Sequence, residues 1–413
     1  MYIEEITIRN IRCFEKLTLH LDPRAEPSTF LALVGDNATG KTTILKAIAM
    51  GLCDESSAAG LMREADMGYV RRGTRWGDIK IILRRRGGRR RYCIKTRIER
   101  HPAGEQLHQT TDPTDRFPWG ELFVSAYGAG RSTSGTGDIA DYSVQNAVYN
   151  LFNYAEGLQN PELSLHRLKS PSAYRMVLST LNAFLETRKI NVTEAGILVD
   201  GLWGDAMPLR DLADGYKSSF LWLTDLLGWA VSRDTSLRRS RDVTGIVLID
   251  EIEQHLHPKW QEQVVPRIRD MFPALQFIAT THSPLVAGSV GGLGKESTCK
   301  ELYHLQLRPG NRVVASEVSS MRGWRADQVL ASAAFDITIS SDRVINDLLK
   351  DASHLLAKGN KRTTSESIRL VKIRRTLARH MIGDEAETEI ERQVQSALDR
   401  ALVERVTQLT ARS

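Results

Sequence analysis

The fold is decided by one stretch, FLALVGDNATGKTTILKAI, which runs from Phe30 to Ile48. Its apolar start is typical of a buried strand, its middle of a glycine-rich loop, and its apolar end of a helix that begins at Lys41. Glycines let such a loop turn back tightly, so that several backbone N–H groups converge on a phosphate chain. The positive end of the helix adds to the attraction. The stretch therefore predicts a P-loop and a nucleoside triphosphate site.

The spacing G-x-x-x-x-G-K-T gives each part of this loop a role. Lys41 reaches the terminal phosphates as a point charge, and the Thr42 hydroxyl is placed to ligate Mg²⁺. We predict ATP and Mg²⁺ as cofactors. The residues expected to bind ATP are Gly35, Asn37, Ala38, Thr39, Gly40, Lys41, Thr42 and Thr43.

A second stretch, GIVLIDE at residues 245–251, supplies the other half of the site. An apolar run without a polar break predicts a central parallel strand that is covered on both faces. Acids at its carboxyl end lie where open α/β sheets bind ligands. Asp250 is expected to hold Mg²⁺, directly or through water, and Glu251 to polarise the attacking water.

A third buried strand is predicted at residues 276–281, and it ends at His282. This histidine is expected level with the two acids, within reach of the γ-phosphate. Nearby, His255 and His257 have H-x-H spacing, but no third ligand is evident, so no metal site is predicted there. Residues 258 to about 271 are predicted as a helix that Pro266 kinks or divides.

The composition is that of an ordinary globular protein: 413 residues, of which 41% are hydrophobic and 26% charged. No apolar run approaches the roughly 18 to 20 residues that cross a bilayer, and the N-terminus lacks signal-peptide features, so we expect a cytoplasmic protein without a membrane partner. The four cysteines are scattered without C-x-x-C spacing, which indicates buried, reduced thiols.

The net charge of +6 is unevenly distributed. Residues 71–101 carry thirteen Lys and Arg against two acids, a net +11, so the remainder of the chain carries −5. Within this segment, alternating runs on either side of Gly87-Gly88 predict a β-hairpin with a two-residue link. Its tip is expected to carry Arg84, Arg85, Arg86, Arg89, Arg90 and Arg91.

Two interpretations of this basic hairpin remain open. Its charges either protect an edge strand from pairing or contact the phosphate backbone of DNA or RNA. A charge of +11 exceeds what edge protection requires, which favours nucleic acid.

The other segments are predicted more coarsely. Residues 2–22 alternate as two strands, and residues 101–141 indicate a flexible loop with one ordered turn at Tyr127 to Arg131. Arg131 either approaches phosphate or is an ordinary surface arginine. Residues 144–187 have helical periodicity, and a short strand follows at 196–199.

This order of motifs resembles the ABC-type ATPases of the SMC, RecF and OLD group, and among them the compact ATPases of bacterial antiphage defence, such as the Septu ATPase. The resemblance covers about residues 1–320. It rests on the P-loop, the start IRNIRCF at 8–14, a signature LADGYKS at 212–218, the Walker B motif LIDE at 248–251, a D-loop at 253–258 and a switch THSP at 281–284. The signature lacks the Ser-Gly-Gly of transporter ATPases, and no certain Q-loop glutamine is found.

The resemblance implies an ATPase that acts as a head-to-tail homodimer or higher oligomer. The signature of one protomer would close on ATP held by the other, through Asp214, Gly215, Tyr216, Lys217 and Ser218. His282 would sense the γ-phosphate and Glu251 would activate water, which makes these two the expected catalytic residues. The expected fold is α/β: an ABC-type P-loop ATPase head over residues 1–320 with a mixed β-sheet, an antiparallel basic hairpin and a helical insertion at about 142–220.

Residues 321–413 leave the ATPase pattern and show helical spacing, so an all-helical region for assembly or partner docking is expected. Five carboxylates between Asp384 and Glu391 lie on a predicted helix start, where acids favour the helix dipole. A nuclease would need acids at strand ends, so no intrinsic nuclease is predicted.

These expectations lead to one main hypothesis and two alternatives. The first is an ATPase switch that controls a nucleic-acid-directed effector, such as a nuclease from the same operon, in antiphage defence. The second is an ATP-bound scaffold that holds an effector nuclease with little turnover. The third is a RecF-like ATPase of DNA repair or maintenance.

Overall fold

The computed structural model describes residues 1–21, 30–64, 68–114, 117–131, 135, 141–153, 155, 157–168, 170–194, 196–291, 301–310, 312–318 and scattered positions from 321 to 373. The chain divides into two compact units, Met1–Ile337 and Thr338–Ser413. In the second unit the described residues include part of a helix up to Ile373, where Leu355, Leu370 and Ile373 are buried together. The remainder of the helical region expected at 321–413 lies outside the described residues.

The first unit is built on a six-stranded sheet with the order β14-β13-β3-β12-β11-β7. Its strands are β3 (Phe30–Gly35), β7 (Val124–Tyr127), β11 (Gly245–Ile249), β12 (Leu275–Thr281), β13 (Leu302–Arg308) and β14 (Arg312–Glu317). All neighbours are parallel except β13 and β14, so the predicted mixed sheet is confirmed. Every residue of β11 and β12 is buried, as their unbroken apolar sequences predict.

A second, antiparallel sheet has the order β2-β1-β4-β5-β6. It consists of β1 (Tyr2–Ile11), β2 (Phe14–His20), β4 (Trp76–Arg84), β5 (Arg91–His101) and β6 (Gly104–Asp112). The two N-terminal strands and the basic hairpin are confirmed. The hairpin link is not the two residues predicted, because residues 85–90 all lie between the last paired residues, Arg84 and Arg91.

The loop predicted at 101–141 is wrong at residues 124–127, where the buried strand β7 forms, and at residues 104–112, where β6 forms. This edge strand buries only Leu107, so its sequence lacks the apolar alternation that reveals a strand. Beyond it, a 3₁₀ turn η1 (Trp119–Glu121) precedes β7.

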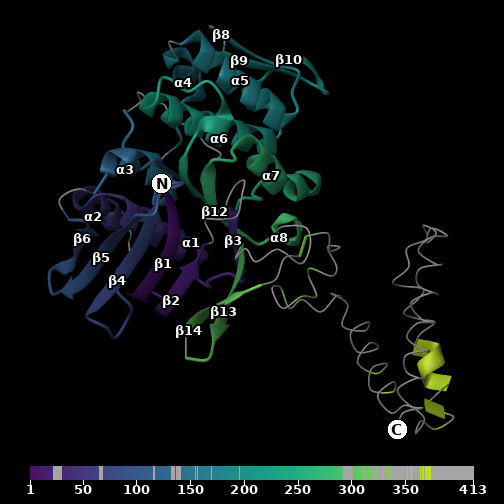
Figure 1. Ribbon diagram of the computed structural model, residues 1–413. Coiled ribbons are helices and arrows are strands. Elements are labelled where there is room, and N and C mark those ends of the chain that lie inside the picture. Colours follow the sequence, from purple (N-terminus) through teal and green to yellow (C-terminus); the bar gives the residue numbers. More distant parts are fainter. Residues whose placement is uncertain are drawn as a thin grey trace. The chain divides into compact units, whose positions relative to one another are not determined.

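Helix α1 (Lys41–Leu52) lies between the two sheets (Figure 1). Its residues Ile44, Leu45 and Ile48 share one apolar core with Leu31 and Leu33 of β3 and with the inward side chains of β1 and β4. The sheets are also joined directly, because the Gln276 side chain of β12 bonds both the N–H and the C=O of Ile3, at 2.7 and 2.9 Å. Helix α2 (Glu55–Arg63) follows, capped by Asp54.

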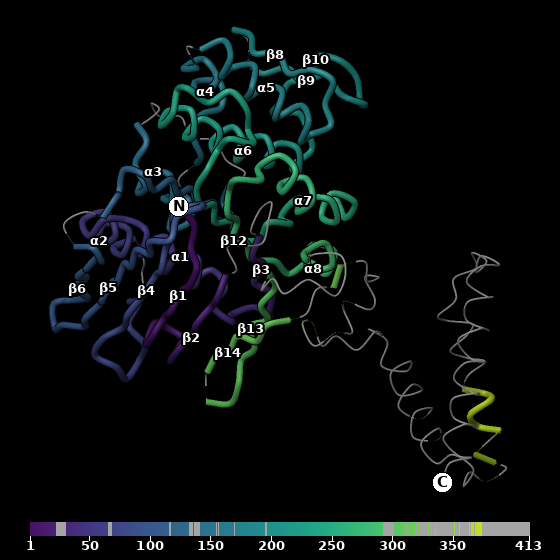
Figure 2. The backbone as a smooth tube through the Cα atoms, viewed as in Figure 1, coloured from purple at the N-terminus to yellow at the C-terminus, as the bar shows by residue number. Residues whose placement is uncertain are grey.

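The opposite face of the six-stranded sheet packs on helices through a second core that includes Phe30, Ala32 and Val34 of β3. The helices of this half of the unit are α4 (Pro161–Arg167), α5 (Pro171–Leu185), α6 (Asp214–Arg233), α7 (Pro258–Met271) and α8 (Pro284–Ser289), with 3₁₀ turns η3 (Leu209–Asp211) and η4 (Ser240–Asp242). Helix α3 (Val144–Val148) and the 3₁₀ turn η2 (Tyr149–Leu151) instead pack mainly on the core around α1, through Val148 and Leu151. The backbone trace shows α5, α6 and α7 on this side (Figure 2). Helix α7 runs through Pro266 without being divided.

The short strand predicted at 196–199 is the middle of a three-stranded antiparallel sheet, β10-β9-β8. Its strands are β8 (Lys189–Thr193), β9 (Gly196–Gly201) and β10 (Gly204–Pro208). Among the described cysteines, all free, Cys53 is buried as predicted, whereas Cys13 and Cys93 are half-buried. In the described part of the chain, no helix is both long and apolar enough to cross a membrane.

Candidate active site

The candidate site lies at the carboxyl ends of β3, β12, β11 and β7, which are neighbours in the sheet. Each strand delivers one functional segment there: the P-loop, the switch, the Walker B acids and the turn that contains Arg131. Gly40 ends the P-loop with φ +86°, and a Cβ on it would lie 2.5 Å from Cys13 Sγ. Only glycine therefore fits where the loop meets α1.

Lys41, the first residue of α1, is buried, and its side chain folds back over the loop. Its Nζ donates to the carbonyl oxygens of Gly35 and Asp36, at 2.8 and 2.9 Å. Burial lowers the Lys41 pKa, and the nearby carboxylates of Asp250 and Glu251 act in the opposite direction. The ammonium group thus stands at the mouth of the loop, where the predicted phosphates would lie.

Thr42 and Asp250 face each other across the site. The Thr42 hydroxyl donates to Asp250 Oδ2 at 2.7 Å, although the two residues are 208 positions apart. Asp250 is buried, and its second oxygen accepts from the Thr280 hydroxyl at 2.6 Å. A hydroxyl and a carboxylate oxygen held this close fit the oxygen ligands that Mg²⁺ prefers. The sequence did not single out Thr280; its only signal was its place near the end of the histidine strand.

Glu251, the expected general base, has an unusual backbone. Its φ is +47°, a left-handed conformation that costs a residue with a Cβ about 1–3 kcal/mol and persists only where the surroundings impose it. The Glu251 N–H donates to the Thr280 hydroxyl at 2.7 Å. The carboxylate is therefore carried on a strained, fixed turn.

Arg131 holds this turn from the other side. Its Nη1 donates to the Asp250 carbonyl and its Nη2 to the Glu251 carbonyl, both at 2.6 Å. The side chain is 2% exposed, so the interpretation of Arg131 as a surface arginine is wrong. Burial lowers its pKa to about 10, with the nearby carboxylates opposing the shift, and Arg131 stays charged at neutral pH. Its sequence signal was only a glycine turn after a strand, which does not reveal what the guanidinium bonds.

His282 follows β12 directly and is exposed. Its backbone N–H donates to Glu253 Oε1 at 2.6 Å, which ties the switch to the segment after Walker B. The structure thus brings the predicted P-loop, Walker B and switch residues to one edge. Contact of His282 with a γ-phosphate stays a prediction.

The signature residues begin α6. Asp214 and Lys217 form an ion pair at 2.9 Å, and both are accessible, whereas Ser218 is 1% exposed and lies inside the unit. A Cβ on Gly215 would lie 2.5 Å from the carbonyl oxygen of His255, so the signature packs directly on the predicted D-loop. Tyr216 lies between Trp203 and Trp260, with ring centroids 4.7 and 4.6 Å away.

A buried acid connects α6 to the site. Asp225, 4% exposed, accepts from the Tyr127 hydroxyl at 3.0 Å and from the Gln159 N–H at 3.1 Å. Burial raises its pKa to about 7. The Tyr127 carbonyl in turn accepts from the Asp250 N–H at 2.8 Å. The sequence reasoning missed this contact, because nothing in an apolar helix indicates which strand its acid meets.

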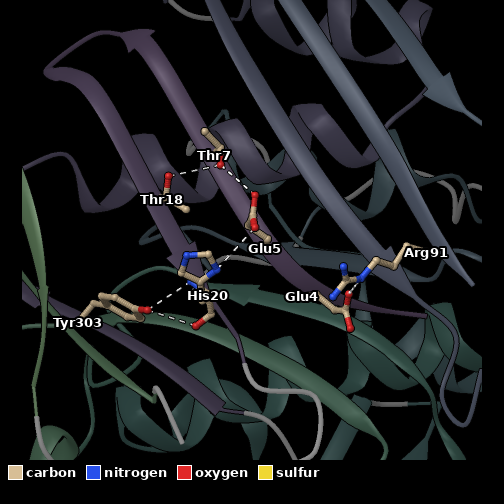
Figure 3. A network of polar contacts seen from close by, with 7 residues as sticks. All are labelled: Glu4, Glu5, Thr7, Thr18, His20, Arg91 and Tyr303. Atoms are coloured by element: carbon tan, nitrogen blue, oxygen red, sulfur yellow. Dashed lines mark hydrogen bonds and ion pairs between the residues drawn. The ribbon is translucent and has the colours of Figure 1, made fainter. Parts of the chain in front are cut away.

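The basic hairpin lies on the antiparallel sheet, away from these strand ends. Arg84 and Arg91 each pair with Glu4 at 2.7 Å, and Arg85 pairs with Glu121. Figure 3 shows the Glu4–Arg91 contact. Arg86, Arg89 and Arg90 are exposed. Arg84, Arg85 and Arg91 are therefore paired with acids of the same unit, and the predicted nucleic-acid contact stays a prediction.

Among the described residues, no group of His, Cys, Asp and Glu has the arrangement of a metal cluster. His257 instead caps α7, where its Nδ1 accepts from the Lys259 N–H at 3.3 Å.

Two family models match this chain. One is described as "AAA domain, putative AbiEii toxin, Type IV TA system" and matches residues 159–288; the other, "AAA ATPase domain", matches residues 1–61. The second model covers the P-loop, and the first covers the signature and the Walker B motif, so each model includes one half of the site.

Several curated proteins are similar in sequence. The Septu protein PtuA of Bacillus mycoides is 28% identical over 346 residues, which are 81% of this chain and 45% of that protein. The "Retron Vc95 probable ATPase" of Vibrio cholerae is 41% identical over 87 residues, 21% of this chain and 17% of that protein. The chain thus spans less than half the length of these relatives.

Solved structures with a similar arrangement include the SMC head domain of Thermotoga maritima, at 13% identity and a TM-score of 0.45 over 77% of this chain and 100% of that one. Another is an SMC head bound to the C-terminal winged-helix domain of ScpA, at 14% identity and a TM-score of 0.48 over 77% of this chain and 98% of that one.

Proposed function

We propose that this chain, which matches AAA ATPase models and is similar in sequence to the Septu protein PtuA and to retron ATPases, works as an ATP-driven switch. ATP closes two copies head to tail, and hydrolysis lets them separate. The observation that carries this proposal is the link between the catalytic turn and the signature helix, through Arg131, Tyr127 and Asp225. A change at the phosphates can therefore reach the surface that a second copy would contact.

The chemistry proposed for the site is in-line attack of water on the γ-phosphate. Lys41 binds the terminal phosphates, and Glu251, fixed by Arg131 and Thr280, accepts the proton of the attacking water. When bound through Thr42 and Asp250, Mg²⁺ would neutralise charge that develops on the phosphate oxygens. His282 is proposed to sense the γ-phosphate.

The position of the signature residues supports head-to-tail closure of two copies. Asp214, Gly215, Tyr216 and Lys217 stand at the start of α6, and their neighbour across Gly215 is the His255 carbonyl in the D-loop. We propose that these residues complete the ATP site of the second copy. A ligand bound by both copies stabilises the dimer by mass action, so ATP would be both the substrate and a ligand that stabilises the dimer.

The relationship to PtuA supports a further part of the proposal, a role in antiphage defence. In this role the switch controls a nucleic-acid-directed effector, such as a nuclease subunit encoded nearby. Purification of the tagged protein from its host tests this directly. Co-purification of a second protein, with an ATPase rate that responds to nucleic acid, supports the effector role; a protein that comes alone and is stimulated by DNA ends would instead indicate repair.

The closure itself is tested with Glu251→Gln, which keeps the site's shape but removes the base. We expect this variant to form an ATP-bound dimer with saturating ATP and Mg²⁺, measured by light scattering. The control is Glu251→Gln combined with Lys41→Ala, which lacks the phosphate ligand and should stay monomeric. A Glu251→Gln protein that remains monomeric in ATP would show that head-to-tail closure is wrong.

A further inference from the structure

The outward face of the five-stranded sheet carries a polar groove of about 680 Å³. It is lined by residues of all five strands, β2, β1, β4, β5 and β6. On these strands the alternate residues, such as Ile6, Ile8 and Ile79, are buried in the core around α1. The groove is therefore on the side of the sheet that faces away from the nucleotide site.

The strand register arranges the groove residues in two rows across the sheet. One row is Thr18, Thr7, Lys80, Lys95 and Thr110, and the next is Lys16, Arg9, Asp78, Arg97 and His108. Strands lie about 4.8 Å apart, so each row spans about 19 Å. The two rows hold five basic side chains and one acid.

The register also places like charges directly opposite each other. Arg9 is paired with Lys16, and Lys80 with Lys95. Side chains in such positions have Cβ atoms about 4.5–5.5 Å apart, and like charges there destabilise a sheet. None of these four side chains forms an ion pair with a described residue, whereas Arg97 is bonded to Asp78 and Glu99, at 3.3 and 2.8 Å.

The groove lining holds five Lys and Arg against two acids, Asp78 and Glu5, so positive charge exceeds negative charge there. This contrasts with the hairpin tip, where Arg84, Arg85 and Arg91 are paired with acids. Of the two acids that line the groove, Asp78 lies in the middle of the second row, between Arg9 and Arg97, and Glu5 lies near Thr7. Figure 3 shows Glu5 at one end, 3.6 Å from His20, next to Thr7 and Thr18, whose hydroxyl oxygens are 3.4 Å apart.

The composition of the lining indicates the ligand. Lysine, arginine and threonine are side chains that contact phosphate oxygens of nucleic acid backbones. Protein partners instead anchor on aromatic and long aliphatic side chains, and among the described lining residues the only apolar one is Ile79, which is buried. Rows of basic and hydroxyl side chains across the sheet suit a regularly charged polymer.

We propose that this sheet face, defined by Arg9, Lys16, Lys80 and Lys95, binds the phosphate backbone of a nucleic acid. The inference deepens the proposed function, since it gives the switch a nucleic-acid contact other than the hairpin tip. It does not depend on closure of the dimer. The electrostatic repulsion within the two side-chain pairs, Arg9 with Lys16 and Lys80 with Lys95, is relieved when phosphate groups lie between the side chains.

The test is the double variant Lys80→Thr/Lys95→Thr in the full chain. Binding of a fluorescein-labelled random-sequence DNA duplex is measured by anisotropy, without nucleotide, over a range of salt concentrations. Each phosphate contact contributes about 0.9 to the salt slope, so loss of two contacts should reduce it by about 1.8 and weaken binding at least tenfold at low salt. The charge-matched control, Arg175→Gln/Lys189→Gln on the exposed surface of α5 and β8, should bind as the unaltered protein does.

A second measurement separates ligand binding from folding. The single variant Lys95→Thr removes one member of a like-charge pair. Its unfolding temperature should therefore stay the same or rise, whereas its affinity for DNA should fall. The proposal is overturned if the double variant keeps its affinity and salt slope, or if polyglutamate displaces DNA from the unaltered protein at equal charge concentration. Because Glu251→Gln dimerisation in ATP is measured separately, failure here leaves the switch intact.

Discussion

Substitution of Arg131 offers the sharpest test of what fixes the turn at Asp250 and Glu251. We predict that Arg131→Met lowers ATP turnover by about 10²-fold, the loss expected from misplacing a catalytic group by about 1 Å. Affinity for ATP should stay within a few-fold, because the hydrogen bonds of Arg131 go to Gly128, Asp250, Glu251 and Gln254 and not to the P-loop, which is proposed to bind the phosphates. The variant thus separates positioning of Glu251 from binding of the nucleotide.

The magnitude follows from the contacts. Arg131 donates to the carbonyls of Asp250 and Glu251 at 2.6 Å and of Gly128 at 3.2 Å. A hydrogen bond from a charged donor contributes about 1.5–3 kcal/mol, so loss of the two short ones should destabilise the unit by about 3–6 kcal/mol. Glu251, with φ +47°, would then be free to relax to an ordinary backbone conformation.

Three measurements on one preparation separate an effect on turnover from effects on nucleotide binding and on stability. They are steady-state phosphate release, affinity for a fluorescent ATP analogue and urea unfolding. The matched control is Arg100→Met, which removes bonds to the carbonyls of Val70 and Thr74, at 2.5 and 3.5 Å, on the antiparallel sheet and should lower stability without lowering turnover. If Arg131→Met fails to fold, Arg131→Lys keeps the charge but cannot bridge both carbonyls. Turnover within threefold of the unaltered protein, in a folded variant, would refute the positioning role.

Two further predictions concern α6. Gly215→Ala places a Cβ 2.5 Å from the His255 carbonyl, so it should abolish ATP-dependent dimerisation in light scattering while monomers still bind a fluorescent nucleotide. Asp225 has its pKa raised to about 7 by burial, so the folded state binds its proton more tightly than the unfolded chain does, and stability should fall as the pH rises from about 4 to 7. At about 1.4 kcal/mol per pKa unit the fall approaches 4 kcal/mol, and urea unfolding of Asp225→Asn should show a much weaker pH dependence over that range.

Much of the fold was accessible from sequence because its signals are local. A run such as GIVLI at residues 245–249 indicates burial on both faces, and the G-x-x-x-x-G-K-T spacing between a strand and a helix predicts a phosphate loop. Alternation revealed β1, β2 and the hairpin strands. It failed for β6, an edge strand whose side chains mostly face water, so that apolar residues are not required there.

The site divides in the same way. Thr42, Asp250 and Glu251 were assigned from motifs, and the structure brings the first two within 2.7 Å. Arg131 and Thr280 were not assigned, because their partners are backbone and side-chain atoms on other strands. No local pattern encodes such a contact.

The sequence by itself determined the chemistry: a phosphate loop, two acids and a histidine, each at the end of an apolar strand. These depend on residue type and on neighbours a few positions away. The tertiary structure decided which atoms meet. Because β7 and β11 are neighbours in the sheet, Arg131 lies next to the turn at Asp250 and Glu251. The strand register places Lys80 opposite Lys95 and Arg9 opposite Lys16. Pairing between strands is fixed by the packing of the whole core, and so only the folded chain reveals it.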